Sequence, residues 1–138
     1  MNQAIPEHMV EFGHGYTYSG HPVACAAGLA TLELLKREHL IEQSAALAPV
    51  FEEALHGLKG SKHVLDIRNC GLAGAIQIAP RDGDGVIRPF EAGIKLWNAG
   101  FYVRFGGDTL QFGPTFNTQP EELDRLFNAV GEVLNQLD

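Results

Sequence analysis

Glycine and proline interrupt this chain so often that no helix or strand can run far without meeting one of them. The 138 residues include sixteen glycines and seven prolines, and both residue types tend to end or kink regular structure. Helical patterns nevertheless extend over residues 22–37, 40–58 and 121–137, and the shorter intervals between glycines suit strands. This spacing predicts a small domain of mixed α+β order.

The first helix is expected to begin at Pro22, because proline is tolerated in the first helical turn and presets its backbone angle. Residues 23–37 then contain no further helix breaker except Gly28. The first half of this segment carries small side chains, namely Ala24, Cys25, Ala26, Ala27, Gly28 and Ala30. Small side chains let another backbone approach closely, so we expect this half to be buried between layers.

Three further segments have helical patterns. Residues 40–58 place apolar side chains three to four positions apart, which is typical of an amphipathic helix, although Pro49 should kink or divide it. Residues 121–137 carry one continuous apolar stripe, and Thr118–Glu121 offers a capping box at its start. A shorter helix is expected over residues 90–98, with Phe90, Ile94 and Trp97 on one side.

Four short runs have the composition of strands and are separated by glycine turns. They cover residues 64–69, 72–79, 101–105 and 110–112, with Cys70-Gly71 and Gly106-Gly107-Asp108 between the members of each pair. Strands joined by such short turns are antiparallel. We therefore expect a mostly antiparallel sheet of about four strands with the helices packed on one face.

Charge and composition exclude several classes of function. Ten basic residues against seventeen acidic ones give a net charge of −7, which disfavours binding to nucleic acid or to an anionic membrane. No apolar run is long enough to span a bilayer, and Glu7 and Glu11 do not fit a secretory signal. Only Cys25 and Cys70 are available, so neither a disulfide framework nor a paired-cysteine metal site is expected. These features predict a cytoplasmic protein.

Two motif-like stretches do not meet the requirements of the sites they suggest. Gly13-His14-Gly15 begins like a dinucleotide-binding fingerprint, but Tyr18 stands where the third glycine should be and no strand precedes it. Asp82 and Asp84 lack the remaining ligand positions of a calcium loop and suit a tight turn. The six histidines show no metal-binding spacing, so we predict no metal site.

The loop of residues 15–22 has the chemistry of an anion-binding site. Thr17 and Ser19 supply hydroxyl groups, the glycines let backbone N–H groups approach an anion closely, and the loop runs into a helix N-terminus. An aromatic loop that only caps the helix is the alternative interpretation of the same residues.

Three strings in this chain closely resemble the class III pyridoxal-phosphate aminotransferases. They are HGYTYSGHPVACAA at residues 14–27, DIRNCGL at residues 66–72 and YVRFGGDTL at residues 102–110. The resemblance runs from about Gly13 to the end and covers the C-terminal portion of that family. It implies the C-terminal small domain of a fold-type I transferase, preceded by a long linking helix.

The resemblance also implies domain boundaries and site residues. Residues 1–37 would form a cross-subunit loop and a linking helix at the edge of the large domain, and residues 38–138 the small domain. Thr17 would bind the phosphate of the cofactor held in the partner subunit, and Tyr16 would line that neighbouring site. Arg104 would receive the substrate carboxylate when an α-amino or α-keto acid is bound, a role for which a planar guanidinium is well suited.

The family needs a lysine that forms a Schiff base with the cofactor and an acidic partner for its pyridinium nitrogen. The lysines of this chain, Lys36, Lys59, Lys62 and Lys95, match no such motif, so we expect no catalytic residue here. The resemblance implies a longer enzyme that moves an amino group from an ω-amino acid or amine to pyruvate through pyridoxal phosphate. It further implies a homodimer or higher oligomer formed through the large domain, and a fragment that is inactive alone.

Other functions remain open at this point. A related class III enzyme of the 4-aminobutyrate or ornithine type has similar requirements. A stand-alone binding or assembly domain could keep the fold without the chemistry. An independent small hydrolase would need Ser19 and His21 to act together with an acid, although no serine-elbow motif surrounds Ser19.

Overall fold

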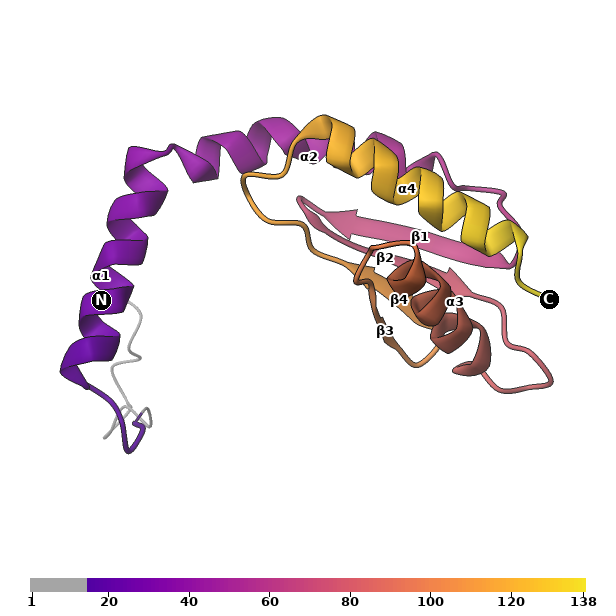
Figure 1. Ribbon diagram of the computed structural model, residues 1–138, viewed down its shortest axis with the longest axis horizontal. Coiled ribbons are helices and arrows are strands. Elements are labelled where there is room, and N and C mark those ends of the chain that lie inside the picture. The colour runs from indigo at the N-terminus through magenta and orange to yellow at the C-terminus, as the bar shows by residue number, and fades with distance from the viewer. Residues whose placement is uncertain (1–14) are drawn as a thin grey trace, which may run out of the picture. The chain divides into compact units, whose positions relative to one another are not determined.

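The computed structural model describes residues 15–138, so the expectations that concern Gly13, His14 and the first part of segment 1–37 lie outside it. The chain divides into two compact units between Glu38 and His39. The elements, shown in Figure 1, are α1 (Pro22–Arg37), α2 (Leu40–His56), β1 (Val64–Cys70), β2 (Ala73–Ile78), α3 (Ile87–Asn98), β3 (Arg104–Gly106), β4 (Thr109–Phe112) and α4 (Pro120–Asn135).

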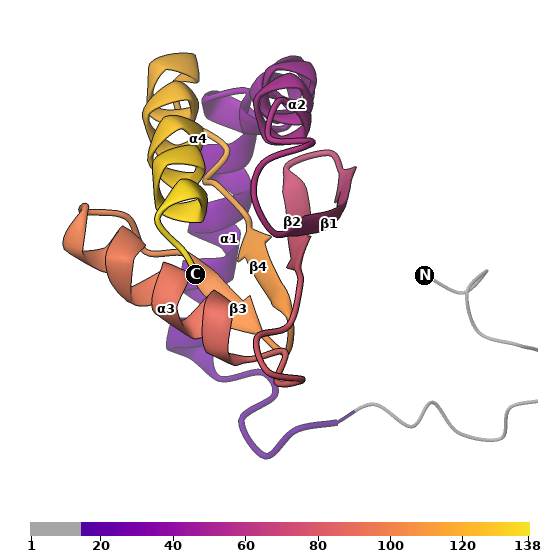
Figure 2. The same cartoon turned by 90° about the vertical axis from the view of Figure 1, so that its right-hand side faces the viewer.

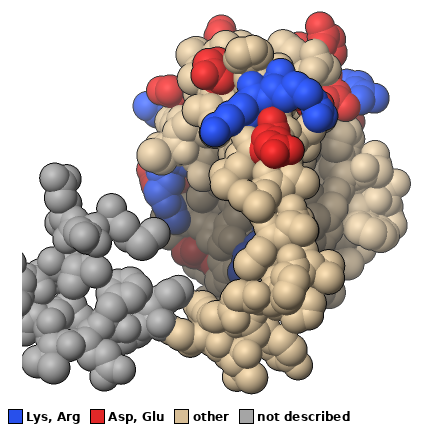
Figure 3. Space-filling model, turned by 90° about the vertical axis from the view of Figure 1, so that its left-hand side faces the viewer, with Lys and Arg blue, Asp and Glu red and all other residues tan. Residues whose placement is uncertain are grey.

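The first unit contains α1, which begins at Pro22 as predicted. Lys36 and Arg37 lie in its last turn, where positive charge is favourable beside the unpaired carbonyl groups. Figure 3 shows charged side chains gathered at one end of this helix. The small-residue half of α1 was expected to be buried, but the helix has no buried residue in this chain. A helix buries a face only where another element packs against it.

The second unit is built on one four-stranded sheet in the order β1-β2-β4-β3, with every neighbouring pair antiparallel. Gly71 and Gly107 lie in the turns of the two hairpins, each with a positive φ that glycine adopts without steric cost. The antiparallel sheet of about four strands is thus confirmed. The third strand begins at Arg104 rather than at Phe101, because the Phe101 N–H donates to the Leu96 carbonyl at the end of α3.

Helices α2, α3 and α4 cover one face of this sheet, as Figure 2 shows and as the sequence predicts. The core between the layers consists of apolar side chains from both helices and strands. Phe51 of α2 packs edge-to-face against Phe127 of α4, with ring centroids 5.6 Å apart. Ile76 and Leu110, which are paired in the β2–β4 ladder, are completely buried beneath these helices.

Pro49 does not divide the second helix, which is continuous from Leu40 to His56. Proline removes one backbone hydrogen bond from a helix interior, but Leu47, Phe51 and Leu55 on either side of it are buried in the core. Their burial fixes both halves of the helix against the same layer.

The capping box of the last helix lies one residue later than predicted. Gln119, not Thr118, is the N-cap, and its N–H donates to the Glu122 carboxylate at 2.9 Å. Pro120 then occupies the first helical position, which proline favours because it has no N–H to leave unpaired. The apolar stripe of the helix is confirmed as its buried face.

Helix α3 begins at Ile87, three residues before the predicted start. Its buried side consists of Pro89, Ala92, Gly93 and Leu96, whereas Phe90, Ile94 and Trp97 are about half exposed or more. A Cβ atom at Gly93 would lie 2.8 Å from the Phe105 ring. The absent side chain therefore allows α3 to approach β3 closely.

Candidate functional site

The loop before α1 is a tight turn closed by a side chain. The backbone N–H of Tyr16 donates to Ser19 Oγ at 3.0 Å, and the Ser19 N–H donates to the Tyr16 carbonyl at 3.0 Å. Ser19 thus shapes the turn rather than adding a second outward hydroxyl beside Thr17. Tyr16 is 73% exposed, as an aromatic side chain would be if it lined a neighbouring site.

Thr17 lies at the tip of this turn and is exposed. Within residues 15–138 its hydroxyl has no hydrogen-bond partner. The same described range contains no Ser19–His21 hydrogen bond, and the His21 ring instead lies edge-on to Tyr18 with centroids 6.5 Å apart. The hydrolase alternative therefore lacks the nucleophile–base contact that it requires.

Arg104 differs from the other arginines of the chain in its partners. Five of the six arginines, all within the described residues, bind an acceptor, whereas Arg104 has neither a hydrogen bond nor an ion pair there. Arg37, Arg68, Arg81 and Arg125 pair with carboxylates, and Arg88 binds backbone carbonyls. An exposed guanidinium with no protein acceptor is available to an anionic ligand.

Arg104 lies on the sheet face opposite the helices and lines a shallow pocket of about 330 Å³ with Tyr102, Gln111, Phe112 and Gly113. Gln111 is its direct partner in the β3–β4 ladder. Side chains opposite each other in an antiparallel pair stand on the same face of the sheet. The pocket thus combines one cation, one amide and the aromatic ring of Tyr102, whereas the Phe112 ring packs against Phe127 in the core.

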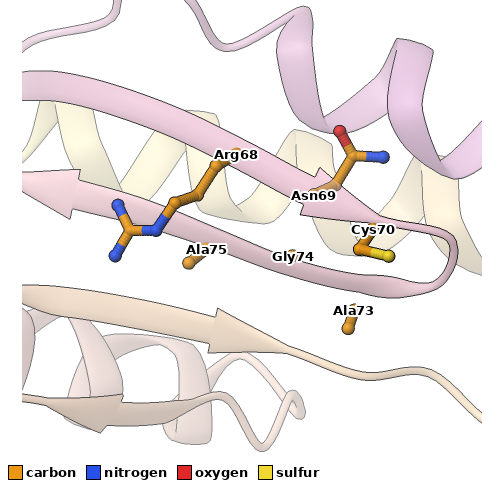
Figure 4. Close-up of a pocket in the computed structure, with 6 residues that line it drawn as sticks. All are labelled: Arg68, Asn69, Cys70, Ala73, Gly74 and Ala75. Atoms are coloured by element: carbon orange, nitrogen blue, oxygen red, sulfur yellow. The ribbon is translucent and has the colours of Figure 1, made fainter.

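The second arginine on this part of the sheet, Arg68, already has a partner. It forms an exposed ion pair with Asp66 on its own strand, at 3.1 Å. Figure 4 shows its side chain over β2 beside Ala75, in a second pocket on the sheet. Arg68, Ala75, Gln111 and Arg104 form one row across the four strands, so the backbones of the two arginines are about 14 Å apart.

None of the four lysines lines the Arg104 pocket. Lys62 donates to the Leu137 carbonyl and Lys95 pairs with Glu91. Over the part of the chain that the structure describes, no cluster of side chains could hold a metal ion. Among the described helices, none combines the length and the apolar character that a membrane crossing requires.

Sequence reasoning missed Gln111 and Tyr102 as members of the Arg104 pocket. The signal for Gln111 was present, because a two-residue turn at Gly107-Asp108 pairs Gly106 with Thr109 and therefore Arg104 with Gln111. Tyr102 stands two residues before Arg104, and alternation along an extended chain places both side chains on one face.

The family model for class III aminotransferases matches residues 1–134. The beta-alanine–pyruvate aminotransferase of Pseudomonas aeruginosa is 78% identical over 135 residues, covering 98% of this chain and 30% of the relative. The omega-amino acid–pyruvate aminotransferase of Pseudomonas putida is 74% identical over 137 residues, covering 99% of this chain and 30% of the relative. The chain thus spans about 30% of the length of these curated relatives.

Solved structures of aminotransferases superpose on this chain. An adenosylmethionine-8-amino-7-oxononanoate aminotransferase from Methanocaldococcus jannaschii superposes with a TM-score of 0.83 at 28% identity, covering 99% of this chain and 33% of that protein. An omega transaminase variant from Pseudomonas jessenii has a TM-score of 0.80 at 27% identity, covering 91% of this chain and 29% of that protein.

Proposed function

This chain belongs to the class III aminotransferases, and from that premise we propose that it is part of an enzyme transferring an amino group from an ω-amino acid or amine to pyruvate. The observation that carries the proposal is its identity of 78% and 74% to two relatives whose names give pyruvate as a substrate. A gamma-aminobutyrate transaminase of Solanum lycopersicum is only 35% identical. The difference favours the pyruvate type over the 4-aminobutyrate alternative.

In this proposal Arg104 binds the substrate carboxylate. Its support is the contrast with the other arginines, which all have an acceptor within the described residues, and its place in an open pocket. A guanidinium can donate two parallel hydrogen bonds to a carboxylate, which fixes the orientation of the substrate as well as adding affinity.

The loop before α1 would hold the phosphate of pyridoxal phosphate in the partner subunit of a dimer, with Thr17 as donor and Tyr16 beside it. The exposed Thr17 hydroxyl and the adjoining helix N-terminus fit a dianionic phosphate. When bound, pyridoxal phosphate supplies the electron sink that aminotransfer requires. The residues of this chain bind and orient, and the Schiff-base lysine and the pyridinium partner would come from the rest of the enzyme.

We assign the two structural units different roles. Residues 1–37 would serve as cross-subunit loop and linking helix, and residues 38–138 as the small domain that presents Arg104 to the substrate. No lysine lines the Arg104 pocket, so the 138-residue chain by itself should show no transaminase activity.

The test uses a holoenzyme in which this chain replaces the matching segment of the Pseudomonas aeruginosa relative, a graft favoured by their 78% identity. Donor kcat/KM is measured for β-alanine and for propylamine, which has a methyl group where β-alanine has its carboxylate. Arg104→Met should lower the β-alanine to propylamine ratio about 100-fold, since charge-assisted bidentate pairs are among the stronger polar contacts.

Arg125→Met is the matched control, because Arg125 is exposed on α4 and its ion pair with Glu122 is long, at 4.0 Å. It should leave the substrate ratio unchanged. An unchanged ratio in the Arg104 variant would reject the carboxylate role, and an inactive graft carrying the unaltered chain would reject the assignment of activity.

A further inference from the structure

Gln111 is the neighbour of Arg104 that is best placed to share its ligand. The two residues face each other in the β3–β4 ladder and line the same pocket. Within the described residues the Gln111 side chain, like that of Arg104, has no hydrogen-bond partner. Two adjacent polar groups on one sheet face are thus both unused by the protein itself.

Gly106 provides the space in which the Gln111 amide lies. A Cβ atom at Gly106 would stand 3.0 Å from Gln111 Nε2, a distance at which the amide would have to shift by a few tenths of an ångström. Gly106 follows Arg104 by two residues on β3, so both positions face the same side of the sheet. The amide therefore lies over β3 about 7 Å along the strand from the base of Arg104.

The nearby acidic side chains are already occupied. Asp66 binds Arg68, and Asp108 in the β3–β4 turn accepts a hydrogen bond of 2.6 Å from Gln77. Gln111 is uncharged, so it can donate to an anion without neutralising Arg104. A carboxylate bound by Arg104 would then find a second donor in the Gln111 amide.

We propose that Gln111 is the second donor of the carboxylate subsite and a determinant of selectivity for carboxylate-bearing substrates, and that Gly106 keeps the space its amide needs. This inference rests on the proposed function of Arg104. The substrates of this subsite would be small ω-amino and α-keto acids, whose carboxylate would be bound by both Arg104 and Gln111. Amines without a carboxylate gain nothing from either side chain.

The test uses the same grafted holoenzyme and the same two donors. Gln111→Met keeps the length of the side chain and removes the amide, so the β-alanine to propylamine ratio of kcat/KM should fall about tenfold, the loss of one hydrogen bond to a charged group. Gln111→Glu should lower the ratio further, because the new carboxylate pairs with Arg104, and activity should partly return as the pH falls and that group is protonated.

Gly106→Ala is a second substitution that should lower the β-alanine to propylamine ratio. Its Cβ should displace the amide and lower the ratio in the wild-type background, yet cause little further loss when added to Gln111→Met. Such non-additivity identifies a shared interaction. Gln136→Met, at the end of α4 and outside the pocket, is the matched control.

The outcomes separate the two claims. If Arg104→Met lowers the ratio while the Gln111 and Gly106 variants leave it unchanged, the Gln111 role is wrong and the proposed function stands. If the Arg104 variant also leaves the ratio unchanged, the carboxylate role of Arg104 fails and the Gln111 role fails with it, whereas the assignment of transaminase activity is decided by the unaltered graft. Additive losses from Gly106→Ala and Gln111→Met would reject the role of Gly106.

Discussion

Gly74 of β2 faces the ring of Phe51 on α2 so closely that a Cβ atom at residue 74 would lie 2.8 Å from Phe51 Cζ. Leu55 Cδ2 would be equally near, at 2.7 Å. Phe51 and Leu55 are both completely buried, so neither can move away without disturbing the core. The missing side chain sets how closely the second helix approaches the sheet.

Gly74→Ala should therefore lower the free energy of unfolding by about 1–3 kcal/mol, the usual cost of adding a methyl group to a packed core. Urea denaturation of the full chain, followed by circular dichroism, measures the change. Gly113→Ala is the control, because nothing lies within 4 Å of its Cβ position, and it should change stability little. Equal effects of the two substitutions would contradict the close-packing argument.

The turn between β3 and β4 also depends on one glycine. Gly107 has a φ of +57°, which costs an L-residue about 1–2 kcal/mol, whereas asparagine tolerates it better. Gly107→Ala should destabilise the chain by about 1 kcal/mol, and Gly107→Asn by less. Thermal unfolding of both variants measures this order, and an alanine variant as stable as the asparagine variant would contradict it.

Sequence patterns predicted most of the second unit because each pattern there matched a local physical cause. The apolar stripe of α4 fixed its buried face, and Gly71 and Gly107 marked both hairpins. The pattern does not distinguish the two candidate N-caps of α4, because Thr118 and Gln119 both precede a proline and an acidic residue. Only the packed structure selects Gln119.

The sequence patterns did not predict which residues and elements contact one another in the folded chain. Arg68 pairs with Asp66 two residues away, and nothing in its sequence context distinguishes that local pair from one across the domain. The role of the small residues in α1 depends on an element that would cover them, and the chain buries none of that helix. The role of Arg104 was predicted from the resemblance to class III aminotransferases, whereas its neighbour Gln111 could be identified only from the register of β3 and β4.

Arg88 of α3 joins the segment just after β2 to the distant residue Asp138 beyond α4. Its guanidinium donates to the carbonyl groups of Ala79 and Pro80 after β2, at 2.8 and 2.5 Å, and to the Asp138 carbonyl beyond α4, at 2.6 Å. Arg88→Ala should reduce stability by about 2 kcal/mol, because hydrogen bonds from a charged donor are stronger than neutral ones. Hydrogen exchange should quicken in the last turn of α4, and Arg125→Ala, which removes only a long surface pair, should not reproduce this.

Acid sensitivity should depend on Glu91 of α3. The Arg81 guanidinium, 2.7 Å away, lowers the pKa of this carboxyl below its ordinary 4.5 through a hydrogen bond and charge, with Lys95 contributing from the other side, whereas partial desolvation opposes the shift. A carboxyl whose pKa is lower in the folded state stabilises the fold above its unfolded pKa, and that contribution is lost as the pH falls through the folded value.

Glu91→Gln should therefore reduce stability at pH 7 and make the decline in stability below pH 4.5 shallower. Urea denaturation at a series of pH values between neutrality and pH 3 gives both quantities for each variant. Glu52→Gln is the matched control, because Glu52 is an exposed residue of α2 that belongs to no ion pair of the described residues. Wild-type and Glu91→Gln curves that stay parallel through the acid range would show that the Arg81–Glu91 pair contributes nothing to the pH dependence of folding.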